Sequence, residues 1–178
     1  FFENDRYVIS SAVGHLVQQA LPTTEEGKML PWKFDSLPVI PDQFALEPSE
    51  QKGSKSRLTV LKRLMKRKDV SELINACDDG RDGELIFRYI IQFAGVDKPT
   101  KRLWMQSMTD GAIREAFSDL RSDADMKPLA DAAYCRSESG WLIGISSPRA
   151  MPAFNSKFGG FNKTPVGRVQ TRTLALLG

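Results

Sequence analysis

The stretch from residue 72 to residue 95 constrains the fold more than any other part of the chain. It reads ELINAC, then DDGRDG, then ELIFRYIIQFAG. The short apolar run is typical of a buried strand, and the apolar spacing of the last segment predicts a helix that ends near Gly95. Strand, loop and helix in this order indicate a βαβ unit, so we expect an α/β fold with a parallel sheet and flanking helices.

The rest of the first two thirds of the chain fits this expectation. Five prolines between residues 22 and 48 exclude a regular helix there and predict an irregular connection, with Trp32 and Phe34 as its anchors. Strands are expected over 6–13 and 101–106, and helices over 56–67 and 109–121, the last capped by Thr109 or Asp110.

The last third has no strand signal. A long helix is expected over 127–145, and a glycine-rich loop followed by a helix over 159–177. Charged and small residues interrupt the periodic pattern between 121 and 125. We therefore predict one domain over 1–122 and the beginning of a second, helical domain over 123–178.

Composition leaves the class of function open. The 178 residues are 41% hydrophobic and 26% charged with a net charge of +3, which is ordinary for a globular chain and too small to prove nucleic-acid binding. No apolar run is long enough for a transmembrane helix, and no signal peptide is recognisable. Cys77 and Cys135 are far apart and are expected to be free thiols, so we expect a cytoplasmic protein.

The acid run carries the chemistry. Three aspartates and Glu84 fall within seven positions directly after the expected strand, where the active sites of parallel sheets gather. Like charges at this spacing repel one another unless a cation offsets them. The run is therefore either a Mg²⁺ site, which needs one or two carboxylates plus water and phosphate, or a solvated turn with an acidic helix start. The residues alone leave both readings open.

Five short stretches resemble motifs of one enzyme family, in the same order along the chain. DDGRDGELIFR resembles the acidic motif of the Toprim domain in type IA DNA topoisomerases, in the form D-A-G-R-E-G-E-L-I-F-R of the topoisomerase III branch. The other four are SSAVGHL, WKFDSLPVIP, RSESGWLIGISSPRA and TPVGRVQTRTLALL. The resemblance spans residues 7 to 178. It implies a Rossmann-like Toprim sheet that lacks its first strand, followed by part of an α-helical DNA-binding domain.

The resemblance also implies a mechanism. These enzymes cut one DNA strand through a tyrosine that becomes joined to a 5′-phosphate, pass another strand through the gap and rejoin the first without ATP. In the family the Toprim acids hold Mg²⁺, which serves mainly the rejoining step. The implied partner is DNA, mainly single-stranded, and the implied protein is a nucleoid-associated, cytoplasmic monomer.

The family's site residues map onto this sequence one by one. Asp78 matches the first acid of the metal-binding pattern, and Asp82 matches the last, where most relatives have glutamate. Arg81 and Glu84 match the arginine and the second glutamate of the same motif and complete the expected catalytic set, although a local ion pair would explain them as well. We expect Gly80 to let the loop bend and Asp79 to point away to solvent.

Three further residues are expected to contact DNA. The resemblance places His15, the only histidine, near the bound strand, although a structural role is equally compatible with it. Arg168 and Gln170 carry a guanidinium fork and an amide, which suit phosphate oxygens, whereas the alternative is a helix cap beside a solvated arginine.

Two observations keep other functions open. Gly140, Pro148 and Arg172 replace residues that the family motifs carry, and neither the nucleophilic tyrosine nor the first-strand glutamate has a counterpart in the chain. We therefore expect a piece of a longer protein that is inactive alone. The alternatives are a degenerate copy that binds DNA without cutting it, and a Toprim primase or nuclease that shares only the acid motif.

Overall fold

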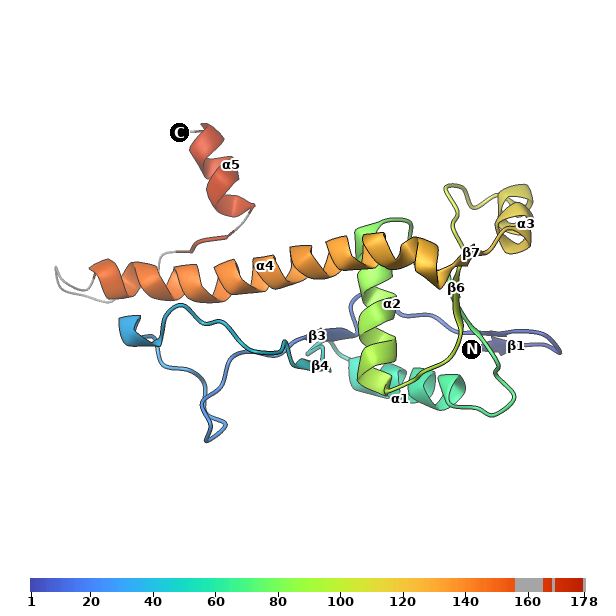
Figure 1. Ribbon diagram of the computed structural model, residues 1–178, viewed down its shortest axis with the longest axis horizontal. Coiled ribbons are helices and arrows are strands. Elements are labelled where there is room, and N and C mark those ends of the chain that lie inside the picture. The colour runs from blue at the N-terminus through green and yellow to red at the C-terminus, as the bar shows by residue number, and fades with distance from the viewer. Residues whose placement is uncertain (156–164, 168, 178) are drawn as a thin grey trace. The chain divides into compact units, whose positions relative to one another are not determined.

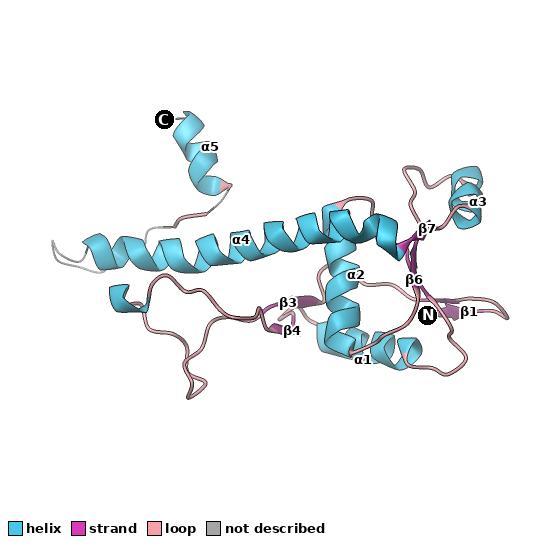
Figure 2. Cartoon of the chain, in the orientation of Figure 1, coloured by secondary structure: helices cyan, strands magenta, loops and turns pink. Residues whose placement is uncertain are grey.

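The computed structural model describes residues 1–155, 165–167 and 169–177 (Figures 1 and 2). Contacts divide the chain into two compact units, one formed by Phe1–Gln18 with Leu46–Tyr134 and the other by Gln19–Ala45 with Cys135–Gly178. The assignment of a Toprim domain to 1–122 and a helical domain to 123–178 stays a prediction.

The central element of the first unit is the expected βαβ unit. Strand β5 (Leu73–Asn75) is followed by helix α2 (Arg81–Ala94) and strand β6 (Thr100–Arg102). The two strands are parallel. Helix α2 ends at Gly95, whose φ of 61° lies in the left-handed region where glycine is favoured. The predicted strand, loop, helix and parallel pairing are therefore confirmed, and the fold is mixed α/β.

The segment after β6 differs from the prediction at one point. Helix α3 (Asp110–Ser118) begins as expected, because the Thr109 side chain accepts a hydrogen bond from the Ala112 amide. The chain then forms strand β7 (Arg121–Ser122), which pairs antiparallel with β6. Two exposed polar residues carry no strand signal, so the sequence predicted helix and boundary where this strand lies (Figure 1).

A compact apolar core holds the first unit together. Helix α1 (Ser54–Met65) contributes Leu58, α2 contributes Leu85, Tyr89 and Ile90, and Ala133 completes the cluster. Leu16 and Val17 also belong to it, at the start of strand β3 (Val17–Gln19), which pairs with β4 (Leu46–Pro48). The strand expected over 6–13 is much shorter: β2 (Val8–Ile9) pairs antiparallel with β1 (Phe2–Glu3).

In the second unit the proline-rich connection is irregular, as predicted, with one short 3₁₀ turn at Phe34–Ser36. Phe34 is 64% exposed, so the prediction that it anchors the connection is wrong. Trp32, the other predicted anchor, is half-buried with the Arg149 guanidinium over its ring, and Phe44 packs edge-on against Trp141 with ring centroids 5.4 Å apart. Trp141 also donates a hydrogen bond from Nε1 to the Ala20 carbonyl at 3.0 Å.

The long helix predicted over 127–145 extends further at both ends. Helix α4 runs from Asp123 to Asn155, and helix α5 (Gln170–Leu177) follows near the C-terminus (Figure 1). Within the described ranges no helix is long and apolar enough to cross a membrane.

Candidate functional site

The acid run forms the loop between the carboxyl end of β5 and the first turn of α2. Gly80 caps the helix with φ of 107° and ψ of −173°, a conformation that only glycine adopts readily. The predicted bend at Gly80 is therefore confirmed. Its carbonyl accepts a hydrogen bond from the Glu84 amide, which begins the helix.

Gly83 brings the helix close to the loop. A Cβ atom at this position would lie 2.0 Å from the Asp78 carbonyl oxygen and 2.9 Å from the Asp78 amide nitrogen. Only a residue without a side chain lets the first turn of α2 approach the Asp78 backbone in this way. The sequence reading assigned no role to Gly83.

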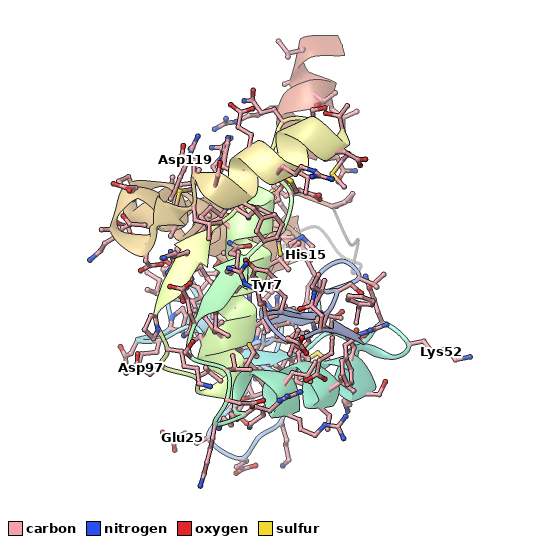
Figure 3. All side chains as sticks on the ribbon, turned by 90° about the vertical axis from the view of Figure 1, so that its right-hand side faces the viewer. Tyr7, His15, Glu25, Lys52, Asp97 and Asp119 are labelled. Carbon is pink, nitrogen blue, oxygen red and sulfur yellow. The ribbon has the colours of Figure 1, made fainter. Side chains whose placement is uncertain are left out.

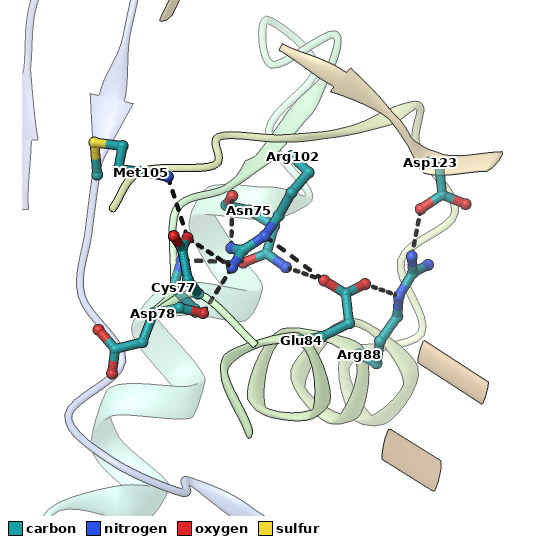
Figure 4. Close-up of polar contacts among 9 residues, drawn as sticks. Asn75, Cys77, Asp78, Glu84, Arg88, Arg102, Met105 and Asp123 are labelled. Carbon is teal, nitrogen blue, oxygen red and sulfur yellow. Dashed lines mark hydrogen bonds and ion pairs between the residues drawn. The ribbon is translucent and has the colours of Figure 1, made fainter. Parts of the chain in front are cut away.

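A buried arginine holds the opposite side of the same backbone (Figure 4). Arg102, at the end of β6, is 1% exposed. Its Nη1 donates to the Asn75 carbonyl at 3.1 Å and to Asn75 Oδ1 at 2.9 Å, and its Nη2 donates to the Asp78 carbonyl at 2.6 Å. The guanidinium fork therefore joins the ends of both parallel strands to the acid loop.

Glu84 balances this buried charge. It is also 1% exposed, and its carboxylate accepts hydrogen bonds from Asn75 Nδ2 at 3.0 Å and from Arg88 Nε at 2.8 Å. Arg102 Nε lies 3.8 Å from Glu84 Oε2, and Arg88 Nη2 lies 2.7 Å from Asp123 Oδ1. Glu84 is thus the buried centre of a polar network rather than half of an exposed pair.

Burial and charge act on the network in opposite directions. Burial lowers the pKa of Arg102, although the negative charge of Glu84 opposes this shift. Burial would also lower the pKa of Arg88, but hydrogen bonds to Asp123 and Glu84 outweigh it and raise the value. Burial raises the pKa of Cys77, whose amide donates to Asn75 Oδ1.

Asp79 does not point to solvent, so that prediction is wrong. Its Oδ1 accepts a hydrogen bond from the Met105 amide at 3.1 Å and lies 3.9 Å from Arg102 Nη2. Its Oδ2 is buried and has no hydrogen-bond partner among the described residues. The positive charge of Arg102 and the free amide of Met105 draw the side chain inward, and both belong to a segment more than 20 residues away along the chain.

The remaining acids of the run are exposed. Asp78 and Asp82 both lie at the surface, and the Asp78 carboxylate is directed away from the buried network (Figure 4). Within the described ranges no group of three or more acids, cysteines or histidines could enclose a metal ion. Two exposed carboxylates fit a cation that keeps most of its waters and shares a phosphate, which is how Mg²⁺ is commonly bound.

Of the other expected site residues, Arg81 directly follows the loop, while His15, Arg168 and Gln170 lie apart from it in the sequence. Arg81 is exposed in the first turn of α2, and His15, labelled in Figure 3, is exposed after Gly14, whose φ is 69°. Gln170 is exposed at the first residue of α5. Arg168 lies outside the described residues.

The chain is similar over nearly its whole length to proteins named DNA topoisomerase 3. It is 39% identical to the protein of Bacillus subtilis (strain 168), 38% identical to that of Bacillus licheniformis and 37% identical to that of Bacillus anthracis. Each alignment covers 99% of this chain and 23% of the relative, so the chain spans about a quarter of the relatives' length. No protein-family model matches the chain.

These similarities confirm the resemblance to the topoisomerase III branch: the chain is homologous to one segment of that family. The residues that support the acid loop, Asn75, Asp79, Gly83 and Arg102, were not recognised as supports from the sequence. A signal existed for Asn75 and Arg102, which are polar or charged residues in expected strands, where burial requires a charged or hydrogen-bonding partner.

Proposed function

We propose that this chain is a segment of a type IA DNA topoisomerase, and that it supplies the metal-holding loop and part of the surface that holds a single DNA strand. The observation that carries the proposal is the similarity over the whole chain to relatives named DNA topoisomerase 3. The whole protein would cut, pass and rejoin single strands through a 5′-phosphotyrosine without ATP. It would act as a monomer in the cytoplasm, at the nucleoid.

In this proposal Asp78 and Asp82 hold Mg²⁺. Both are exposed, and Asp78 follows the carboxyl end of a parallel strand, where the sites of such sheets gather. When bound, the ion supplies positive charge to the phosphate oxygens during rejoining. Arg81, exposed between the two acids, would contact the same phosphate. Glu84 would act indirectly, by supporting the loop, because it is buried and already accepts hydrogen bonds from Asn75 and Arg88.

His15, Arg168 and Gln170 would contact the DNA backbone. An imidazole, a guanidinium and an amide all suit phosphate oxygens, which carry no sequence information. Binding to single strands should therefore tolerate any sequence and weaken with salt. Gln170→Ala and Arg168→Ala should weaken binding equally for all sequences, and Arg168→Ala should also reduce the salt dependence. Unchanged affinity in both folded variants would remove these residues from the DNA surface.

Titration with Mg²⁺ tests the metal site. The ion should raise the thermal stability of the chain by mass action, and Asp78→Asn and Asp82→Asn should each abolish the rise. Asp79→Asn is the matched control, because asparagine keeps the Oδ1 acceptor for the Met105 amide and should keep the Mg²⁺ effect. An equal loss in all three folded variants would indicate only a diffuse attraction of cations to an acidic turn.

A second candidate is a degenerate copy that binds DNA without cutting it. Asp82, Gly140, Pro148 and Arg172 each replace the residue that the family motif carries, and this favours a loss of activity. A Toprim primase or nuclease is a weaker alternative, since it would share the acid motif alone. For the 178-residue chain by itself we expect neither nicking nor relaxation of supercoiled DNA. A covalent adduct with a labelled single strand, trapped in denaturant, would contradict that expectation.

A further inference from the structure

Two hydrogen bonds, which we call ties, hold the acid loop, and neither of them uses the Asp78 carboxylate. The first is the hydrogen bond from Arg102 Nη2 to the Asp78 carbonyl at 2.6 Å. The second is the hydrogen bond from the Met105 amide to Asp79 Oδ1 at 3.1 Å. Arg102 is the last residue of β6, the neighbouring parallel strand, and Met105 lies three residues after it. Two adjacent residues of the loop are therefore fixed to one neighbouring segment.

We propose that Arg102 and Asp79 are positioning residues for the acid loop: they fix the backbone at 78 and 79 so that the Asp78 carboxylate is presented outward in one orientation. Of the two adjacent aspartates, Asp79 is used for structure and Asp78 remains available for a cation. The part of this inference that concerns the loop stands on the contacts alone. The part that concerns metal rests on the proposed function.

The burial of the network explains why the ties are specific. Arg102 is 1% exposed. Its Nη1 donates to two oxygens of Asn75 and its Nη2 donates to the Asp78 carbonyl, so the fork has a single arrangement that meets all three acceptors. A lysine could keep the charge beside Glu84 but could not reach Asn75 and the Asp78 carbonyl together, since its ammonium is one point rather than a planar fork.

Gly83 closes the loop from the side of the helix. Because a Cβ there would overlap the Asp78 carbonyl oxygen, the Asp78 peptide lies between the first turn of α2 and the Arg102 guanidinium. A peptide enclosed on two sides loses little further freedom when its carboxylate binds a cation. Preorganisation of this kind raises affinity by reducing the cost of ordering.

Arg88 provides the matched control. Like Arg102 it pairs with Glu84, at 2.8 Å, but its other partner is Asp123 rather than the acid loop. Arg102→Lys and Arg88→Lys should therefore disturb the buried Glu84 charge in a comparable way, while only Arg102→Lys removes a tie from Asp78. An effect found in both variants would come from the disturbed charge balance around Glu84 and not from the lost contact to the acid loop.

The first measurement needs no metal. Amide hydrogen exchange of a peptide covering residues 76–83 should speed up by about tenfold or more in Arg102→Lys, as expected for the loss of a hydrogen bond from a charged donor. In Arg88→Lys the same peptide should change by less than about twofold, because no contact to the loop is lost. Equal acceleration in both variants, or none in Arg102→Lys, would overturn the inference.

The second measurement is the affinity for Mg²⁺ by isothermal titration. Arg102→Lys should bind about fivefold to tenfold more weakly, because the carboxylate must be ordered on binding, and Arg88→Lys should bind as the parent chain does. If the parent chain binds no Mg²⁺, the proposed metal site fails, while hydrogen exchange still decides the role of Arg102.

Asp79 supplies an independent comparison if Arg102→Lys does not fold. Asp79→Asn keeps the acceptor for the Met105 amide, whereas Asp79→Ala removes it. Loop exchange should stay near the parent rate in Asp79→Asn and rise by about tenfold in Asp79→Ala. The same exchange rate in these two variants would mean that the Asp79 tie does not hold the loop.

Discussion

Two buried arginines, one in each compact unit, are held in different ways. Arg102 is 1% exposed and has three hydrogen bonds to Asn75 and Asp78, with the carboxylates of Glu84 and Asp79 within 4 Å. Arg149 is 6% exposed, and within the described part of the chain its Nη1 donates to the Ile145 carbonyl at 2.9 Å and its guanidinium lies 5.0 Å from the centre of the Trp32 ring. Among the ion pairs of the described residues, none includes Arg149.

The pKa shifts follow the same division. Burial lowers the pKa of both guanidinium groups, but only for Arg102 do neighbouring negative groups oppose the shift. Arg102 therefore takes part in a charge-compensated network, while Arg149 is a desolvated cation stacked on an aromatic ring. Burial alone therefore does not decide how much a charged residue contributes to the stability of its unit. The contribution depends on the buried partners that would lose their compensation if the residue were removed.

The largest expected effect is the removal of the compensated cation. Arg102→Met leaves Glu84 buried with one cationic partner fewer and leaves the Asp78 carbonyl without its donor. The free energy of unfolding should fall by about 3–5 kcal/mol, the usual cost of breaking a buried ion pair. Urea denaturation followed by circular dichroism measures it. A loss below about 1 kcal/mol would mean that the network contributes little to stability.

A smaller effect is expected from two glycines. Gly83→Ala places a Cβ against the Asp78 backbone, so it should destabilise the chain by about 1–3 kcal/mol or more. Gly144→Ala, inside α4 with nothing near its Cβ, should stabilise by about 0.5–1 kcal/mol because alanine loses less conformational freedom on folding. Effects of the same sign in the two variants would contradict the close approach at Gly83.

The sequence was sufficient for the elements that local signals define. The strand at 73–75, the helix that ends at Gly95 and the Thr109 cap all depend on neighbouring residues, and all were predicted. The position of the two exposed acids relative to the strand end followed from the same pattern. These features follow from periodicity and capping, which a single sequence contains.

The partners of the acid loop could not be predicted from the sequence. Asp79 turns inward because Met105 and Arg102 lie more than 20 residues further along the chain, and no local rule pairs them. Strand β7 was missed for a related reason: two exposed polar residues form a strand only because β6 offers a free edge. Tertiary context decided both.

Arg149→Met should have a smaller effect than Arg102→Met or Gly83→Ala. The substitution removes one hydrogen bond to a carbonyl and the stacking on Trp32, but it also removes the cost of burying a cation without a carboxylate. The free energy of unfolding should change by less than about 1 kcal/mol in either direction. A loss as large as that of Arg102→Met would mean that Arg149 has a compensating partner outside the described residues.

The smallest expected effect compares the two thiols. Cys77 lies in the acid loop, where burial raises the pKa of its thiol, with Asp78 and Glu84 acting in the same direction and Arg102 against them. The folded chain therefore holds the Cys77 proton more tightly than the unfolded chain. The stability that this provides is complete below the pKa of an unfolded thiol, about 8.5, and is lost as pH rises through the folded pKa.

Two single-thiol variants isolate this contribution under reducing conditions. Cys135→Ala retains only Cys77, and Cys77→Ala retains only the exposed Cys135. Between pH 7 and pH 10, a range that spans the pKa of about 8.5 of a free thiol, the free energy of unfolding should fall further for Cys135→Ala than for Cys77→Ala. The other groups that titrate in this range are common to both variants, so the difference between them reports the thiols. Parallel pH profiles would show that the acid loop leaves the Cys77 thiol as free to ionise in the folded chain as in the unfolded one. Such a result would also argue against a closely held loop, because a thiol beside a loosely held peptide would be hydrated in the folded state.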